Sequence, residues 1–143
     1  MATASQDYAG DEGVLSARGA GWVAFAAVML GLAGLWNVLE GILAIGQSRV
    51  YVNDSTFVFS DLNTWGWIML CLGALQLFAA FTIVSGSEFG RWLGVGAALL
   101  NSIGQLYFMP AYPLWATLMF AVDVLIVYGL VVYGGNKMKG VFD

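Results

Sequence analysis

Apolar residues gather in four long runs that fill most of the chain, at about residues 21–45, 64–84, 91–109 and 113–133. Each run has roughly the 20 residues with which a helix crosses a hydrocarbon core of about 30 Å. Lipid offers no hydrogen-bond partner to the backbone, so such a run crosses as a helix that satisfies its own N–H and C=O groups. The pattern therefore predicts an all-α integral membrane protein, an up-and-down bundle of four transmembrane helices.

Polar segments flank and separate these runs. Residues 1–20 are rich in Gly, Ala and Ser and carry acidic side chains, which predicts a disordered tail and not a signal peptide. Residues 46–63 form a longer loop, in which β-branched and aromatic residues flank turn residues 53–55; this pattern predicts a short β-hairpin or extended flap. Residues 136–143 are a second short tail, so we expect one transmembrane domain over 21–135.

Several residues mark the ends of the expected helices. Asn63 or Thr64 is suited to cap the second helix. Pro110 closes the third helix, and Pro113 lies in the first turn of the fourth, where a missing N–H has no cost. The short turn between these prolines predicts that the third and fourth helices are antiparallel neighbours. Gly134 then ends the fourth helix.

Basic residues predict how the helices are oriented. In a four-pass topology, Arg18, Arg91, Lys137 and Lys139 lie on one side and only Arg49 lies on the other. Positive charge is concentrated on the cytoplasmic side of membrane proteins, so both termini are predicted to be cytoplasmic. Aromatic residues fit interfacial belts, with an inner group of Trp22, Trp92 and Tyr133 and an outer group of Trp65, Trp67, Tyr107, Tyr112 and Trp115.

Composition agrees with a membrane protein and excludes several kinds of chemistry. Charged residues are 10% and hydrophobic residues 60% of the chain, against about 25% and 45–50% in soluble domains. The sequence has no histidine and one cysteine, Cys71, which argues against His-ligated haem, a CxxC redox pair and a disulfide. The five basic residues are scattered, which is unlike a nucleic-acid interface. We expect no cofactor, no metal site and no catalytic residue, and therefore not an enzyme.

The polar side chains inside the runs are the candidates for a site. Counted by depth along each helix, Gln76, Asn101 and Asp123 fall near the middle, while Asn37, Glu40 and Gln105 fall in the outer half. A carboxylate in lipid costs about 2.5 kcal/mol or more, so Glu40 and Asp123 each need a partner or a purpose. The face of Asp123 on its own helix is apolar, which makes Gln76 and Asn101 its candidate partners.

Small residues line one face of three helices, which lets membrane helices approach closely and hydrogen-bond. These stripes are 27, 31, 34, 37 and 41 on the first helix, 66, 73, 76 and 80 on the second, and 94, 97, 98, 101, 104 and 105 on the third.

Two interpretations of the polar residues stay open. In the first, Asp123, Asn101 and Gln76 form a satisfied polar knot that fixes the bundle, and Glu40 extends toward the interface or pairs with Arg49. In the second, Glu40 and Asp123 belong to a proton or cation relay, or to a small-molecule site that opens outward. Catalysis by a carboxylate is a third option, but the sequence shows no second catalytic partner.

The order of motifs resembles a family of small four-helix membrane proteins from actinobacteria that is named only as a domain of unknown function. The matching segments are 21–26 (GWVAFA), 37–41 (NVLEG), 64–67 (TWGW), 111–115 (AYPLW) and 123–128 (DVLIVY). One departure is Phe89-Gly90-Arg91, where the family has an aromatic residue, Ala and Arg. The resemblance implies the four-helix fold and a plasma-membrane location, but no activity.

The leading hypothesis is a non-enzymatic membrane protein, structural or an accessory subunit. Its expected partners are the lipid bilayer and either a larger membrane protein complex or further copies of itself. The alternative is a small oligomeric proton- or cation-coupled transporter or channel that uses Asp123 and Glu40.

Overall fold

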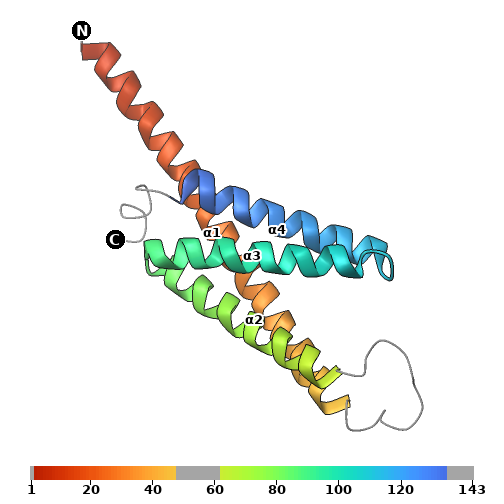
Figure 1. Cartoon of the computed structure of the whole chain (residues 1–143). Helices are drawn as coiled ribbons and strands as arrows, with labels where there is room; N and C mark the ends of the chain where they lie inside the picture. The colour runs from red at the N-terminus through yellow and green to blue at the C-terminus, as the bar shows by residue number, and fades with distance from the viewer. Residues whose placement is uncertain (1, 48–61, 135–143) are drawn as a thin grey trace.

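The computed structural model describes the backbone of residues 2–47 and 62–134, and the side chains of residues 18–46 and 63–134. The described chain is entirely helical apart from short turns (Figure 1). Its helices are α1 (Ala2–Gln47), α2 (Leu62–Val84), α3 (Glu88–Phe108) and α4 (Pro113–Tyr133).

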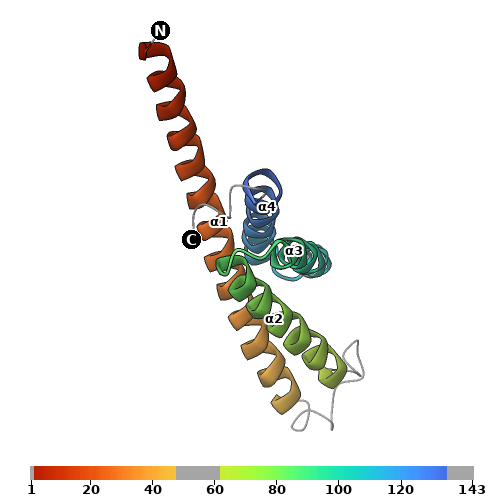
Figure 2. The same cartoon turned by 90° about the vertical axis from the view of Figure 1, so that its left-hand side faces the viewer.

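The four helices form two antiparallel hairpins, α1–α2 and α3–α4. Each helix packs against two others, in the cyclic order α1, α2, α3, α4 and back to α1. The hairpins cross at an angle, so that α3 and α4 are seen nearly end-on in Figure 2 while α1 and α2 run obliquely past them. They converge where α2 leads into α3, and they separate toward the end that holds the α3–α4 turn (Figure 1).

Helix α1 differs from the prediction at its start. It begins at Ala2, so the backbone of residues 2–20 is helical and is not the disordered tail that we expected. The segment has no proline and several alanines, the residue with the highest helix propensity. Extending an existing helix adds one hydrogen bond for each residue ordered, which is far easier than starting a new one.

The other helix ends follow the predictions closely, with two corrections. Helix α2 begins at Leu62, so Asn63 and Thr64 lie inside its first turn and neither caps it. Helix α3 begins at Glu88, before the expected residue 91, because Ser87 caps it by accepting a hydrogen bond from the Gly90 N–H at 3.4 Å. Helix α4 has the predicted bounds, with proline in its first turn and glycine at its C-cap. The flap expected within 46–63 falls mainly on 48–61, outside the described residues.

Three helical segments are long and apolar enough to cross a membrane: Arg18–Gly46, Asn63–Val84 and Pro113–Tyr133. The chain is therefore a membrane protein by length and composition, and the prediction of four such segments is confirmed for three. Helix α3 is long enough but less apolar than the other three, because it contains the polar residues Glu88, Arg91, Asn101, Ser102 and Gln105.

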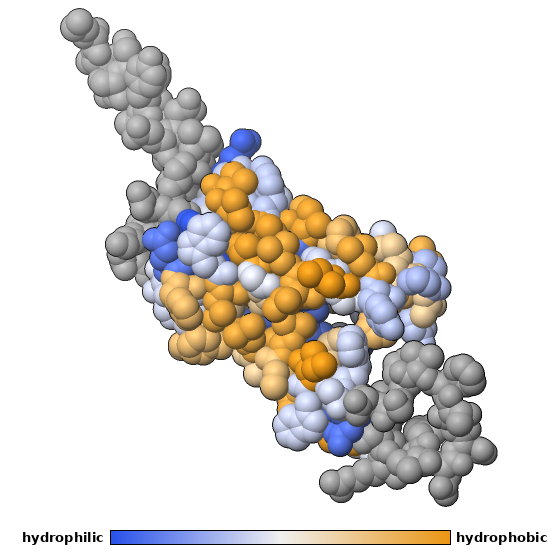
Figure 3. All heavy atoms as spheres, viewed as in Figure 1, coloured by the Kyte–Doolittle hydropathy of each residue, from blue (hydrophilic) through white to orange (hydrophobic). Residues whose placement is uncertain are grey.

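The surface of the bundle is apolar, and several polar side chains lie inside it. Figure 3 shows hydrophobic residues covering the middle of the visible face. Phe81 is 72% exposed and Leu114 is 89% exposed, whereas Gln76 and Asp123 are completely buried. In water this arrangement would leave many large apolar side chains in contact with solvent, so it fits a lipid environment.

Glycine pairs hold α1 and α2 in close contact. Gly34 faces Gly73, and Gly41 faces Gly66, so the contact repeats every seven residues on both helices. A Cβ on Gly73 would lie 2.6 Å from the Gly34 carbonyl oxygen, and a Cβ on Gly41 would lie 2.7 Å from the Gly66 carbonyl oxygen. The small-residue stripes predicted on these two helices are thus their mutual interface.

Aromatic side chains pack on one another at both ends of the bundle. Trp22 of α1 stacks on Tyr133 of α4, with ring centroids 6.0 Å apart, at the end where the hairpins converge. Trp65 packs on Phe108 at the end that holds the α3–α4 turn. Beside the first group, Arg91 is mostly buried, with its guanidinium 4.8 Å from the Trp92 ring centroid and 3.5 Å from the Glu88 carboxylate.

Candidate functional site

Four of the six predicted polar residues form one hydrogen-bonded chain, to which every helix contributes one side chain. Asn37 of α1 donates through Nδ2 to Gln76 Oε1 of α2 at 2.7 Å and to Asn101 Oδ1 of α3 at 3.0 Å. Asn101 in turn donates through Nδ2 to Asp123 Oδ2 of α4 at 2.7 Å. We call this set (Gln76, Asn37, Asn101, Asp123) the polar chain. All four side chains are buried, the most exposed at 4%.

The polar chain confirms one predicted contact, and it corrects a second contact and the predicted depth of Asn37. Asn101 is a partner of Asp123, as expected, but Gln76 bonds to Asn37 and has no hydrogen bond to Asp123. Asn37 lies at the level of Gln76 and Asn101, although counting along its helix placed it in the outer half. Gln76 packs beside Gly34, about one turn from Asn37, and its side chain reaches Asn37 along the α1–α2 contact. Asn101 belongs to the other hairpin, which α1 crosses obliquely (Figure 1), so steps along α1 do not match steps along α3.

The polar chain is not fully satisfied, in contrast to the knot that we expected. Within the described residues, Asp123 Oδ1 and Gln76 Nε2 are buried without a hydrogen-bond partner. They are the two ends of the chain. An unpartnered buried polar group costs about 1–3 kcal/mol, so the folded bundle tolerates this cost at both ends.

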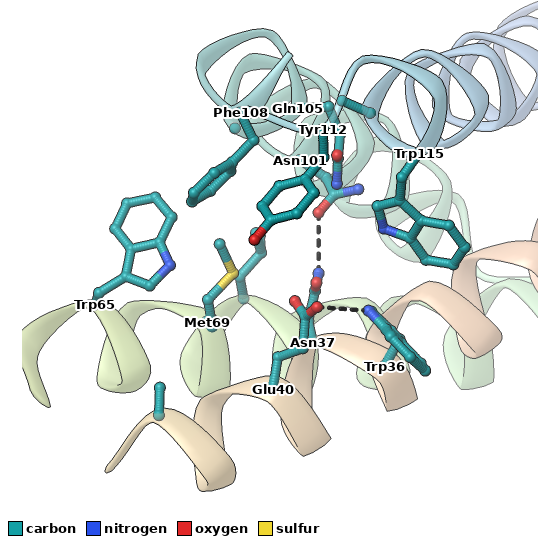
Figure 4. A pocket seen from close by; sticks show the side chains of 14 residues that line it. Trp36, Asn37, Glu40, Trp65, Met69, Asn101, Gln105, Phe108, Tyr112 and Trp115 are labelled. Carbon is teal, nitrogen blue, oxygen red and sulfur yellow. Dashed lines mark hydrogen bonds between the residues drawn. The ribbon is translucent and has the colours of Figure 1, made fainter. Parts of the chain in front are cut away.

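The other two predicted residues, Glu40 and Gln105, lie outside the polar chain and line a pocket beside it (Figure 4). Glu40 Oε1 accepts a hydrogen bond from the Trp36 indole at 2.8 Å. This partner was missed in the sequence, although the two residues are four apart and therefore adjacent on one face of a helix. The alternative partner, Arg49, lies outside the described residues.

The pocket occupies the space where the two hairpins separate, and its volume is about 260 Å³. Asn37 and Asn101 of the polar chain form part of its lining. Two aromatic pairs connect the hairpins beside it, Trp36 with Trp115 at 5.7 Å and Trp65 with Phe108 at 5.3 Å between ring centroids. The full lining is Trp36, Asn37, Glu40, Ala44, Trp65, Met69, Leu72, Asn101, Gly104, Gln105, Phe108, Tyr112, Trp115 and Ala116.

The sequence did not predict this pocket. Three of its aromatic residues, Trp65, Tyr112 and Trp115, were assigned to an interfacial belt, and Trp36 and Phe108 were not singled out. Their convergence depends on how the hairpins cross, and no spacing within one helix reports that angle.

Comparison with known proteins adds a family. A family described as a domain of unknown function, DUF7144, matches residues 22–135. The chain belongs to this family. No curated protein and no solved structure matches the chain. The resemblance to an uncharacterised family is thus confirmed, and the matched DUF7144 region holds the complete polar chain and the complete pocket.

The side chains of the DUF7144 domain set limits on its chemistry. Within the described residues, no group of three or more His, Cys, Asp or Glu side chains is placed to hold a metal ion. Cys71 is a free thiol on the apolar outer face of α2, away from the polar chain. The domain brings together amides, one buried carboxyl group and, in the pocket, a second carboxylate among aromatic rings.

Proposed function

We propose that this DUF7144 protein is a non-enzymatic multi-pass membrane protein with a structural role, an accessory subunit that packs against a larger membrane complex or against itself. The observation that carries the proposal is the polar chain, which links one side chain from each helix. The hydrogen bonds of these four side chains are formed with one another. Polar bonds between helices, together with close glycine contacts, are a general means of fixing a membrane bundle in one arrangement.

The geometry of the two carboxyl groups also favours a non-enzymatic role. Asp123 contacts an amide inside the bundle, and Glu40 contacts an indole at the pocket. General acid–base catalysis needs a proton donor or acceptor placed within reach of a reacting group, usually with a second group in support. Neither carboxyl group has a hydrogen-bonded nucleophile beside it among the described residues.

We further propose that α3 also crosses the plasma membrane, which puts both termini on the same side. The basic residues Arg18, Arg91, Lys137 and Lys139 make the cytoplasm that side. Helices α3 and α4 are each 21 residues long, and they are antiparallel. Helix α3 therefore covers the same depth as α4, about 30 Å. Its polar residues Asn101 and Ser102 face the interior, whereas its exposed positions include Leu99, Leu100, Ile103 and Leu106.

Reporter fusions test this topology. Green fluorescent protein fluoresces after folding in the cytoplasm, and bacterial alkaline phosphatase is active only outside it. We expect fluorescence from fusions at either terminus and no phosphatase activity from either. Active phosphatase at the C-terminus alone would mean an odd number of spans and would contradict the proposal.

The experiment that tests the structural role is purification of the protein from its native membrane in a mild detergent, followed by mass determination of what remains bound. Stoichiometric recovery with a larger complex supports an accessory subunit and identifies the process it serves. A homo-oligomer in which the polar chain is essential for assembly supports a self-packing structural protein. A monomer that carries no partner protein contradicts the proposal.

A second candidate, a small proton- or cation-coupled transporter, is favoured by one specific observation. The polar chain runs from Asp123, whose Oδ1 has no described partner, to Asn37 and Asn101, which line the pocket beside Glu40. An uninterrupted series of polar side chains of this kind is what a proton or cation route requires.

The variant Asp123→Asn separates the two functions. Its amide oxygen still accepts the hydrogen bond from Asn101, so under the structural role we expect folding within about 1 kcal/mol of the wild type. The unfolding midpoint in detergent and pH-dependent flux in proteoliposomes are the two measurements. If the wild type shows such flux and the folded variant does not, Asp123 exchanges a proton and the transporter replaces the structural role.

A further inference from the structure

The pocket is lined by a carboxylate, amides and aromatic rings, and not only by aliphatic side chains. Its walls come from all four helices, and its lining along α1 extends from Trp36 to Ala44, a rise of about 12 Å. In Figure 4 the Glu40 carboxylate is directed toward the α3–α4 hairpin, and Tyr112 directs its hydroxyl toward the α1–α2 hairpin. Both polar groups thus face the space between the hairpins.

The charge of the lining has one sign. Glu40 is the only acidic residue among the fourteen that line the pocket, and none of the fourteen is basic. Its Oε1 accepts one hydrogen bond from Trp36, and its Oε2 has no hydrogen bond or ion pair among the described residues. Glu40 is an exposed side chain at the pocket and gives an otherwise uncharged lining one negative charge, so the pocket favours a cation over a neutral molecule or an anion.

The aromatic residues favour an organic cation over a metal ion. Three tryptophans (Trp36, Trp65, Trp115), Phe108 and Tyr112 border the pocket. Aromatic rings attract ammonium groups through the negative potential of their faces, tryptophan most strongly, and aromatic cages are a common way to bind alkylammonium ligands. A metal ion instead needs several oxygen or nitrogen ligands, which a single carboxylate does not supply.

The volume limits the size of the cation. An apolar cavity of about 150 Å³ holds benzene, so about 260 Å³ has room for a group of roughly ten non-hydrogen atoms. From charge, lining and size together we infer that the pocket binds a small alkylammonium group, with Glu40 as its counter-ion and the tryptophans around it. This inference does not depend on the structural role proposed above. The ammonium group belongs either to a free solute or to the headgroup of a membrane lipid.

Isothermal titration calorimetry of the full-length protein in phosphatidylglycerol nanodiscs tests the inference. The probe is choline, and the control ligand is 3,3-dimethylbutan-1-ol, which has the shape of choline with a neutral carbon in place of the charged nitrogen. We expect choline to bind at least roughly tenfold more tightly than the neutral analogue. Equal affinity for the two, or no choline binding at millimolar concentrations, would overturn the inference. This comparison uses only the wild-type protein and so does not depend on a variant that folds.

Variants then assign the counter-ion. Glu40→Gln keeps the shape of the side chain and removes its charge, so choline affinity should fall roughly tenfold. Glu88→Gln is the matched control, because Glu88 is exposed at the opposite end of α3 and does not line the pocket. An equal loss in both variants would show an effect of net charge alone and would contradict binding at Glu40.

Lipid composition identifies the source of the ammonium group. If phosphatidylethanolamine in the nanodisc weakens choline binding relative to phosphatidylglycerol, the headgroup competes for the pocket and the natural ligand is a lipid. Unchanged affinity assigns the pocket to a free solute. Either result upholds the alkylammonium site.

Discussion

Replacing Gly73 with alanine is expected to destabilise the bundle by about 2–3 kcal/mol, because the added methyl group has no space. Its Cβ would lie 2.6 Å from the Gly34 carbonyl oxygen and 2.7 Å from the Val38 backbone nitrogen. These are backbone atoms of the neighbouring helix, so no side-chain rotation relieves the overlap. Helices α1 and α2 would have to move apart, and the movement would also disturb the Asn37–Gln76 hydrogen bond that joins them.

Unfolding of the purified protein in mixed micelles with increasing SDS measures this effect. Gly96→Ala on α3 is the matched control, because a Cβ there would meet no atom within 4 Å. Alanine has the higher helix propensity, so this control should be neutral or more stable by up to about 1 kcal/mol. Similar stabilities for Gly73→Ala and Gly96→Ala would show that the two helices are not in close contact at Gly73.

Replacing Asn101 with leucine, which has the same branching and the same number of side-chain heavy atoms, is expected to cost about 2–4 kcal/mol. Asn101 is the middle of the polar chain, because it accepts a hydrogen bond from Asn37 and donates one to Asp123. Its loss takes away the only hydrogen-bond partner that Asp123 has in the described structure and leaves the carboxyl group buried. Each unpartnered group costs about 1–3 kcal/mol, with the larger values for groups that carry charge.

The same unfolding assay applies, with Ser102→Ala as its control. Ser102 is the buried neighbour of Asn101, but its hydroxyl donates only to the Ala98 carbonyl of its own helix at 2.9 Å. We expect a change below about 1 kcal/mol there. A double-mutant cycle of Asn101→Leu with Asp123→Leu should recover part of the loss, because the double variant has no orphaned carboxyl group. Strict additivity of the two changes would refute a direct bond between the side chains.

The four helices differ in the contacts that they make in the bundle. Helices α1 and α2 pack closely through their glycine pairs. Asn101 of α3 forms hydrogen bonds to Asn37 of α1 and to Asp123 of α4. The hairpins converge at one end and separate at the other, so the polar chain lies next to the point where the pocket begins. A ligand in the pocket would therefore contact Asn37 and Asn101, and its binding should raise the stability of the bundle by linkage.

Much of the fold follows from local signals along the chain. The length of the apolar runs predicted the helices, and Pro113 and Gly134 predicted both ends of α4, because these signals depend on a few neighbouring residues. The start of α1 was missed, because a polar, acidic segment without proline is compatible with both a tail and a helix. The cap of α3 was also missed, although Ser87 stands before Glu88 in a way that is typical of a helix start.

The candidate site divides in a similar way. The six polar residues stand out in the sequence because each interrupts an apolar run, and lipid makes every such interruption costly. Their pairing does not stand out, because Asn37 reaches Gln76 across the α1–α2 contact and reaches Asn101 where α1 crosses the other hairpin. Trp65, Tyr112 and Trp115 were interpreted as an interfacial belt because the sequence indicates how far along a helix a residue lies but not which neighbour it faces.

The sequence by itself determined that the chain suits a lipid environment, where its helices lie, and which polar residues cost free energy to bury. Hydropathy, the length of an apolar run and turn residues are all local properties of the chain. Only the tertiary structure decided which of those residues meet and where space remains. Those outcomes depend on the angle between two hairpins, and that angle results from the packing of glycine and side-chain surfaces over many residues at once.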